Sequence, residues 1–145
     1  MAVPPIVLIL YHSANAKNYD LTSLKGMQCG AAPMSGELCA GFEAKFPHCK
    51  IVQGWGLTES SVAITYGRTD QVEHRKSSVG PLLPTWEARI VDADGDDVEE
   101  GEIWARSPAV MEGYHNNPEA TAKTMAPGGW FKTGDVGRLD KDEFF

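Results

Sequence analysis

The chain has 145 residues, 42% of them hydrophobic, and a formal net charge of −7, which fits one ordinary domain or two small ones with enough apolar residues for a core. It has no apolar run of the roughly 18 residues that a membrane-spanning helix needs, and its start lacks the features of a signal peptide. Lys and Arg do not cluster, so the composition disfavours nucleic-acid binding. A single nucleotide can still be held by loops and backbone N–H groups.

Cysteine and histidine give no sign of a disulfide framework or a metal site. Three cysteines stand ten residues apart: Cys29, Cys39 and Cys49. An odd number at this spacing suits neither disulfides nor zinc, so we expect buried free thiols in a reducing compartment. Four histidines are scattered along the chain: His12, His48, His74 and His115. We expect each of them to be structural or solvated rather than a metal ligand.

The first apolar segment, residues 6–11, follows Pro4-Pro5. Proline is favoured in the first turn of a helix, so this pattern favours a buried helix to about Lys17, although an unbroken apolar run also suits a strand. In the loop that follows, Asp20 or Thr22 is a candidate cap for a short turn.

A strand, a helix and a second strand are predicted over residues 24–53. The first strand, 25–29, leads into Gly30-Ala31-Ala32-Pro33-Met34, a loop of small side chains that let a flat ligand lie against the backbone. A plain strand-to-helix turn is the alternative. Ser35 is a good N-cap, and apolar side chains then recur at helical spacing: Leu38, Cys39, Phe42 and Phe46. Pro47 ends the helix, and a strand follows at 51–53.

This order of elements predicts a parallel strand pair joined by a right-handed crossover. The loops that follow the two strands then lie at the same edge of the sheet. Open α/β sheets bind ligands at that edge. We therefore expect both loops to contribute to one site.

The loop after the second strand carries Gln53-Gly54-Trp55-Gly56-Leu57-Thr58-Glu59. Its glycines let the backbone turn tightly and approach a ligand. The ring of Trp55 can stack on a base, the hydroxyl of Thr58 can donate to a phosphate oxygen, and the carboxylate of Glu59 can bind Mg²⁺. The motif indicates a nucleotide site, although a glycine turn with a buried Trp is an alternative.

The pattern changes to β structure in the second half. After a polar loop at 67–78, strands at 87–91 and 101–106 are predicted to form a hairpin around the acidic turn 92–96. The glycine of this turn stands two positions too early for an EF-hand and no helix flanks it, so we do not expect calcium binding there.

A short helix and a further strand are predicted near the end of the chain. Asn117-Pro118-Glu119 combines a cap, a first-turn proline and a first-turn acid, and the helix should run to Met125. An extended segment at 130–132 then leads to Thr133-Gly134-Asp135, which places Asp135 after a strand. Its carboxylate can accept hydrogen bonds from both hydroxyls of a ribose, although a turn Asp with no ligand is an alternative.

Six motifs in order and spacing carry a family resemblance. They occupy residues 30–33, 54–59, 101–104, 110–114, 117–121 and 133–135. Together they resemble the acyl-adenylate-forming, or AMP-binding, superfamily, in particular its 4-coumarate–CoA ligase-like and acyl-CoA synthetase branch. The resemblance covers nearly the whole chain.

The resemblance implies an α/β plus β fold, as in the large N-terminal domain of these enzymes. Residues 1–75 are expected to form a portion of the parallel α/β layer with the adenine-binding loops, and 76–145 a portion of a distorted β-barrel. The pyrophosphate loop would lie upstream, and the lid domain with its catalytic Lys downstream, so we expect the isolated chain to be inactive. A sheet without its neighbours leaves apolar faces open, so we also expect self-association.

The implied reaction is the ATP-dependent joining of a carboxylic acid to CoA. The carboxylate attacks the α-phosphate of ATP to give acyl-AMP and pyrophosphate, and the CoA thiolate then displaces AMP. The acid is an aryl or a fatty acid, Mg²⁺ accompanies ATP, and the compartment is the cytoplasm or the peroxisome. The alternatives are a domain that loads a carrier protein, a luciferase-like relative and, in another class, a non-catalytic nucleotide-binding or interaction protein.

The resemblance also implies the site residues. Those implied to bind the nucleotide are Gly30, Ala31, Ala32, Pro33, Gly54, Trp55, Gly56, Leu57, Thr58 and Asp135. Trp55 would pack on adenine, where many relatives carry Tyr, and Asp135 would anchor the ribose. Thr58 and Glu59 are the implied catalytic residues, the first contacting phosphate and the second binding Mg²⁺. The segment 54–64 would also border the acyl pocket.

Overall fold

The computed structural model describes residues 1–70 and 75–145, which form two compact units. Met1–Trp55 and Tyr66–Gly80 form the first unit, and Gly56–Thr65 and Pro81–Phe145 form the second. Part of the loop expected at 67–78, including His74, lies outside the described residues. The functional division into 1–75 and 76–145 stays a prediction. In the described part of the chain, no helix is long and apolar enough to cross a membrane.

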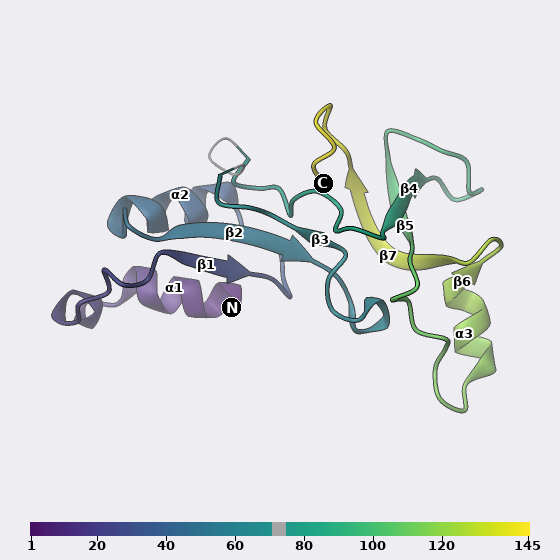
Figure 1. Cartoon of the computed structure of the whole chain (residues 1–145), viewed down its shortest axis with the longest axis horizontal. Helices are drawn as coiled ribbons and strands as arrows, with labels where there is room; N and C mark the ends of the chain where they lie inside the picture. Colours follow the sequence, from purple (N-terminus) through teal and green to yellow (C-terminus); the bar gives the residue numbers. More distant parts are fainter. Residues whose placement is uncertain (71–74) are drawn as a thin grey trace. The chain divides into compact units, whose positions relative to one another are not determined.

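The first unit contains the predicted strand–helix–strand arrangement (Figure 1). Strand β1 (Gly26–Cys29) and strand β2 (Lys50–Trp55) are parallel, and helix α2 (Gly36–Lys45) connects them. The short strand β3 (Thr65–Tyr66) completes the order β1-β2-β3. The predicted parallel pair is therefore confirmed.

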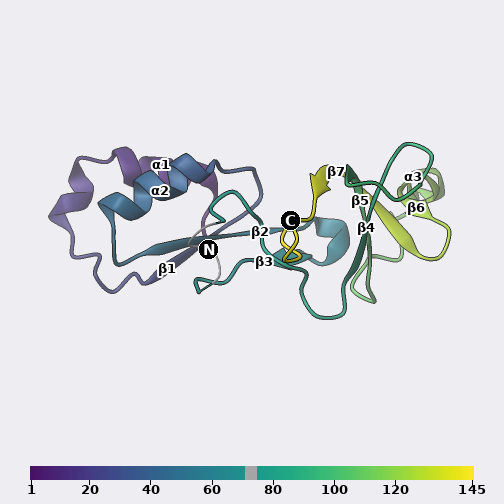
Figure 2. The same cartoon turned by 90° about the horizontal axis from the view of Figure 1, so that it is seen from above.

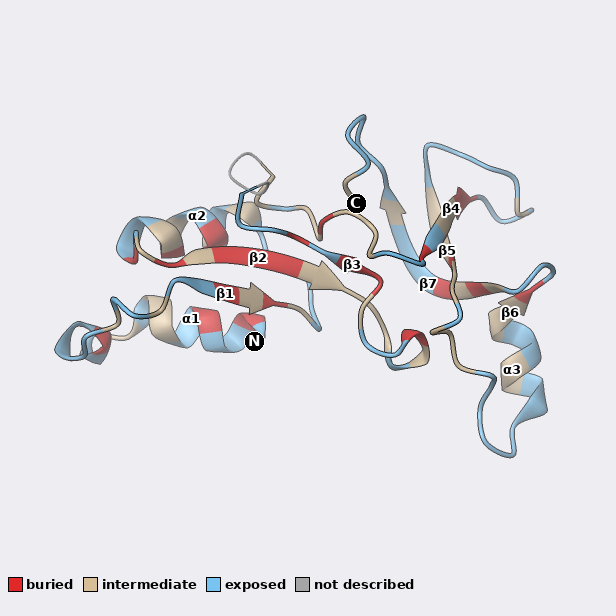
Figure 3. Ribbon diagram, in the orientation of Figure 1, coloured by how far each residue is buried: buried red, intermediate tan, exposed pale blue. Residues whose placement is uncertain are grey.

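Helix α2 begins at the cap that the sequence predicts. The hydroxyl of Ser35 accepts the N–H of Leu38 at 3.2 Å. Helices α1 and α2 lie on the same face of the sheet (Figure 2). The residues of these helices and strands that are buried, red in Figure 3, form the core. That core includes Val7, Met27, Cys29, Cys39, Phe42, Phe46, Cys49 and Ile51.

The cysteines are free and buried, as predicted. Burial raises the pKa of all three thiols, and that of Cys39 reaches about 11, with the nearby charge of Glu43 adding to the effect. A thiol with a raised pKa stays protonated and reacts slowly. These cysteines therefore serve the core rather than chemistry.

Helix α1 (Pro4–His12) exists as predicted, but two expectations about it were wrong. It ends at His12 rather than near Lys17, because Ser13 is extended and a separate 3₁₀ helix, η1 (Asn15–Asn18), follows. Only Pro4 and Val7 are buried, whereas Ile9 is 64% exposed. A helix that is apolar all round can turn only one side to the sheet, and positions 4 and 7, three residues apart, form that side.

The second unit contains a curled antiparallel sheet in the order β4-β5-β7-β6 (Figure 1). Its strands are β4 (Glu87–Val91), β5 (Glu100–Arg106), β6 (Met125–Ala126) and β7 (Trp130–Arg138). The predicted hairpin is formed by β4 and β5. In the turn of this hairpin, a carboxylate oxygen of Asp92 accepts hydrogen bonds from the N–H groups of Asp94 and Asp96. The acidic residues thus shape a turn.

Helix α3 (Pro118–Thr124) begins as the sequence predicts. The side chain of Asn117 accepts the N–H of Ala120 at 3.0 Å, and Pro118 fills the first helical position. The helix ends one residue before the predicted end, because Met125 is extended and starts β6.

Candidate functional site

The loop after β1 and the end of β2 lie side by side in the first unit. Cys29 at the end of β1 is in register with Gln53 of β2. A Cβ atom added to Gly30 would lie 3.1 Å from the carbonyl oxygen of Gly54. The segment 30–33 and the end of β2, with Trp55 half-buried, therefore share one edge of the sheet. The expectation that the two strand ends lie at the same edge is confirmed for residues 30–33 and for Gly54 and Trp55.

The loop after β1 leaves its backbone and small side chains accessible. Ala31, Ala32 and Pro33 are exposed. Ala31 has a φ of 69°, a left-handed conformation that residues other than glycine rarely adopt. Such strain is common where a loop is shaped for a ligand.

Gln53 holds this edge together, a role that sequence analysis missed. Its side chain is buried, and the amide Nε2 donates to the carbonyl oxygens of Met34 at 3.1 Å and Lys76 at 2.7 Å. Met34 closes the loop that follows β1, so the amide ties that loop to β2. A buried Gln in an otherwise apolar strand was the signal for such a role, because buried amides need partners.

In the second unit, residues 56–62 form a tight turn. A Cβ atom at Gly56 would lie 2.1 Å from the carbonyl oxygen of Val62, so only glycine fits there. The 3₁₀ helix η2 (Thr58–Ser60) follows. The hydroxyl of Ser60 accepts the N–H of Leu57 at 2.9 Å and donates to its carbonyl oxygen at 2.8 Å. Thr58 is thereby presented at the surface on a fixed backbone.

Glu59 is held at both its side chain and its backbone. The hydroxyl of Tyr114 donates to Oε1 of Glu59 at 2.6 Å, and the N–H of Met111 donates to the Glu59 carbonyl oxygen at 2.8 Å. The Tyr114 hydrogen bond holds the pKa of Glu59 below its usual value and raises the pKa of the phenol. Glu59 is therefore an ionised carboxylate at neutral pH.

This carboxylate fits Mg²⁺ that arrives with a nucleotide. Across residues 1–70 and 75–145, no group of three His, Cys, Asp or Glu side chains is placed to hold a metal ion. Mg²⁺ in nucleotide sites is commonly held by one or two carboxylates and the substrate phosphates. A single fixed carboxylate supplies what such an ion needs from the protein.

Asp135 lies within β7, so its expected position after a strand was wrong. The pairs Glu102–Val136 and Trp104–Lys132 leave three residues of β7, 133–135, opposite the single residue Ile103. Asp135 therefore belongs to a bulge, with Gly134 at a φ of 75°. Bulges redirect side chains, and this one leaves Asp135 exposed.

The bulge is fixed by hydrogen bonds that sequence analysis missed. A carboxylate oxygen of Glu102 accepts the N–H of Gly134 at 3.0 Å. The hydroxyl of Thr133 donates to the Ile103 carbonyl oxygen at 2.6 Å and accepts the N–H of Asp135 at 3.1 Å. The motifs at 101–104 and 133–135 were recognised in the sequence, but nothing in the linear sequence pairs Glu102 with Gly134.

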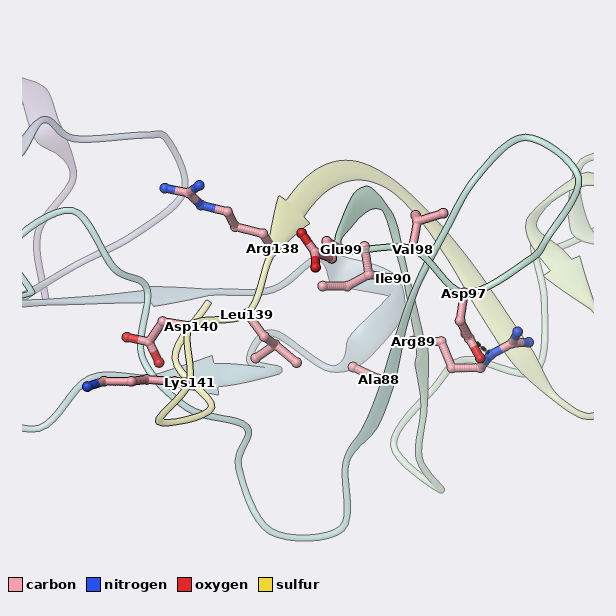
Figure 4. A pocket seen from close by; sticks show the side chains of 10 residues that line it. All are labelled: Ala88, Arg89, Ile90, Asp97, Val98, Glu99, Arg138, Leu139, Asp140 and Lys141. Atoms are coloured by element: carbon pink, nitrogen blue, oxygen red, sulfur yellow. Dashed lines mark hydrogen bonds and ion pairs between the residues drawn. The ribbon is translucent and has the colours of Figure 1, made fainter.

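A separate cavity of about 820 Å³ lies in the second unit between β4 and the end of β7 (Figure 4). Its lining combines apolar side chains with charges of both signs: Ala88, Arg89, Ile90, Asp97, Val98, Glu99, Arg138, Leu139, Asp140 and Lys141. None of the predicted nucleotide-binding residues is among them. We therefore assign the candidate site to the loops and not to this cavity.

A model of the AMP-binding enzyme family matches residues 1–115. The chain belongs to this family. It is 42% identical to 4-coumarate–CoA ligase-like 9 of Arabidopsis thaliana and 38% identical to peroxisomal OPC-8:0-CoA ligase 1 of the same plant. These matches cover 97% and 98% of the chain but only 26% and 27% of the relatives, so the chain spans about a quarter of their length.

The fold agrees with this assignment. The N-terminal domain of FACL13 from Mycobacterium tuberculosis superposes with a TM-score of 0.83 at 31% identity, covering 99% of this chain and 36% of that one. The predicted fold class, an α/β layer followed by a curled β sheet as in the N-terminal domain of an adenylate-forming enzyme, is confirmed.

Proposed function

We propose that the chain provides nucleotide-binding elements of an ATP-dependent acid–CoA ligase. Such a ligase activates a carboxylate as acyl-AMP and transfers the acyl group to CoA. The observation that carries the proposal is the adjacency of the loop after β1 and the end of β2 in a chain 42% identical to a 4-coumarate–CoA ligase-like protein. Binding of ligands at this edge is general for open α/β sheets.

In this proposal, the first unit holds the base. The exposed segment 30–33 forms one wall of the adenine pocket, and Gly54 and Trp55 at the end of β2 form another. Trp55 offers an indole ring, which stacks on a flat heterocycle. Because Trp has no phenol hydroxyl, its contribution is stacking and packing.

The second unit contributes the polar groups in the same proposal. The turn that includes Gly56 and Leu57 presents the hydroxyl of Thr58 to a phosphate oxygen. Glu59 binds Mg²⁺, which neutralises charge that develops on the phosphates when the carboxylate of the substrate attacks. Asp135 accepts hydrogen bonds from the ribose hydroxyls. Positioning and charge neutralisation are the main requirements of such a reaction.

The names of the relatives support a broad class of acid and a choice of two compartments. One relative is named for 4-coumarate and another is named as a peroxisomal ligase. We propose a small aryl or fatty acid as substrate, and the cytoplasm or peroxisome as the compartment. Delivery of the acyl group to a carrier protein is the second candidate function within the family.

The test is calorimetric titration of the chain with a non-hydrolysable acyl-adenylate mimic. We expect binding that Trp55→Ala and Asp135→Ala each weaken by about tenfold, since base stacking is worth roughly 1–3 kcal/mol and a hydrogen bond to a charged group about 1.5–3 kcal/mol. Asp94→Ala, which removes an exposed turn carboxylate, is the control for Asp135→Ala. Equal affinity in all variants, or no binding by a chain shown to be folded, would contradict the proposal.

A further inference from the structure

One of the two carboxylate oxygens of Glu59 accepts a hydrogen bond from a residue 55 positions away in the chain. The Tyr114 hydroxyl donates to Oε1 at 2.6 Å. This is the short distance of a hydrogen bond from a hydroxyl to a carboxylate, which is stronger than a bond between neutral groups. The bond leaves Oε2 of the same carboxylate for another partner.

Tyr114 is itself anchored to helix α3. Its N–H donates to the hydroxyl of Thr121 at 2.9 Å, and that hydroxyl donates to the carbonyl oxygen of Asn117 at 3.0 Å. The N–H of Asn117 in turn donates to the Tyr114 carbonyl oxygen at 3.1 Å. The phenol is therefore carried by a backbone that the N-terminal end of α3 fixes.

The segment 109–114 also holds the backbone beneath Glu59. The N–H of Met111 donates to the Glu59 carbonyl oxygen at 2.8 Å, and the hydroxyl of Ser61 donates to the Ala109 carbonyl oxygen at 2.8 Å. Three hydrogen bonds thus join this segment to η2 and the residue after it. The carboxylate and the phenol are held by the same contacts, so their relative position is fixed before any ligand arrives.

We propose that Tyr114 is a positioning residue for Glu59, fixing Oε1 so that Oε2 faces the Mg²⁺ of bound ATP. The inference rests on the proposed function and deepens it. Partners that orient a metal ligand commonly contribute 10–100-fold to metal affinity or activity. A Tyr that only stabilises the loop would contribute to folding but would not change how strongly Mg²⁺ enhances nucleotide binding.

The test compares the affinity of the chain for α,β-methylene-ATP, a non-hydrolysable analogue, in excess MgCl₂ and in EDTA. The ratio of the two affinities is the Mg²⁺ enhancement. We expect Tyr114→Phe to lower this enhancement by about tenfold and to leave the affinity in EDTA unchanged. Tyr19→Phe is the matched control, because Tyr19 is 71% exposed in a loop.

A double-mutant cycle with Glu59→Gln separates positioning from a structural role. If Tyr114 acts through Glu59, then Tyr114→Phe has no further effect on the enhancement once Glu59 is Gln. Thr121→Val, which removes the acceptor of the Tyr114 N–H, should lower the enhancement in the same direction and gives a second test should Tyr114→Phe not fold. An unchanged enhancement in folded Tyr114→Phe, or an additive effect in the cycle, would overturn the inference.

These outcomes also separate this inference from the proposed function. Absence of nucleotide binding by the folded unmodified chain in both solutions would reject the proposed function and the role of Tyr114 with it. Binding with a full Mg²⁺ enhancement in Tyr114→Phe would reject only the role of Tyr114.

Discussion

Individual residues fix the geometry of the candidate site, and Gly56 is the clearest case. A Cβ atom there would lie 2.1 Å from the carbonyl oxygen of Val62. We expect Gly56→Ala to open the turn, lower the free energy of unfolding by about 1–3 kcal/mol and weaken binding of the adenylate mimic. Urea unfolding and calorimetry measure the two effects.

Gly26→Ala is the control for that substitution. A Cβ atom at Gly26 would meet its nearest neighbour, the carbonyl oxygen of Lys50, at an ordinary 3.6 Å. We expect this variant to bind as the unmodified chain does. Equal behaviour of the two alanine variants would show that the close approach at Gly56 is not required.

Glu43 makes stability depend on pH. Burial alone would raise its pKa, but the hydrogen bonds from Lys76 at 2.7 Å and the Ile51 N–H at 2.9 Å, with the charges of Lys76 and Lys50, outweigh burial and lower it. A folded-state pKa below the unfolded value of about 4.3 means that the stabilisation is complete above that value and is lost as the pH falls through the folded-state pKa.

We therefore expect Glu43→Gln to lower stability at pH 7 by about 1–3 kcal/mol and to flatten the fall in stability below about pH 5. Urea unfolding at a series of pH values measures both. Glu37→Gln, at an exposed position of the same helix, is the control and should change stability at pH 7 by less than about 0.5 kcal/mol. If stability still fell as steeply below about pH 5 in Glu43→Gln, then other carboxylates would be the cause of that fall.

At the scale of elements, the exposed face of the second sheet is covered by alternating cations and indole rings. Arg106 lies 4.4 Å from the Trp130 ring, Arg89 lies 5.8 Å from Trp130 and 5.9 Å from Trp104, and Lys132 lies 5.3 Å from Trp104. These residues come from β4, β5 and β7, so the stacking links three strands on the face opposite the buried side chains.

Arg89→Met tests this arrangement, because Met keeps an unbranched apolar chain but removes the charge. We expect a loss of about 1–2 kcal/mol in the free energy of unfolding, measured by urea unfolding. Arg68→Met is the control: Arg68, like Arg89, pairs with an aspartate, but no ring stacking with it is seen among the described residues. Equal losses in the two variants would assign the effect to the ion pairs alone.

Helices and strands that are determined by residues close together in the chain could be predicted from the sequence. Ser35 and Asn117 cap helices with their own side chains, and the spacing of Phe42 and its neighbours gave the face of α2. The burial of α1 was not predictable in this way, because an apolar run does not say which of its sides the sheet covers. The bulge at Asp135 depends on Glu102, 32 residues before Gly134 in the chain.

The same distinction applies to the candidate site. Residues within the glycine-rich motifs were proposed from the sequence, because their types suit nucleotide chemistry and their spacing resembles the family's motifs, and their roles stay predictions. The groups that hold them, Gln53 and Tyr114, act through contacts with residues 19 to 55 positions away. Such partners follow from the tertiary fold, and no local periodicity marks them.

At the scale of the whole molecule, each unit has its own buried side chains, yet apolar residues remain at the surface. Helix α1 exposes Ile6, Leu8 and Ile9, which lie on one short helix. A patch of this kind favours association when it finds a partner. The net charge of −7 opposes association through mutual repulsion between copies, and salt screens this repulsion.

We expect the isolated chain to self-associate through α1, more strongly in high salt than in low salt. Ile9→Glu should reduce association without lowering stability by more than about 0.5 kcal/mol, because the side chain is exposed. Sedimentation velocity over a range of concentrations measures the change. Val136→Glu, at a position 72% exposed in the second unit, is the control and should associate as the unmodified chain does. A chain that stays monomeric at high concentration, with a slowly exchanging cooperative core, would contradict this prediction, because it would show that the exposed face of α1 neither attracts a partner nor limits stability.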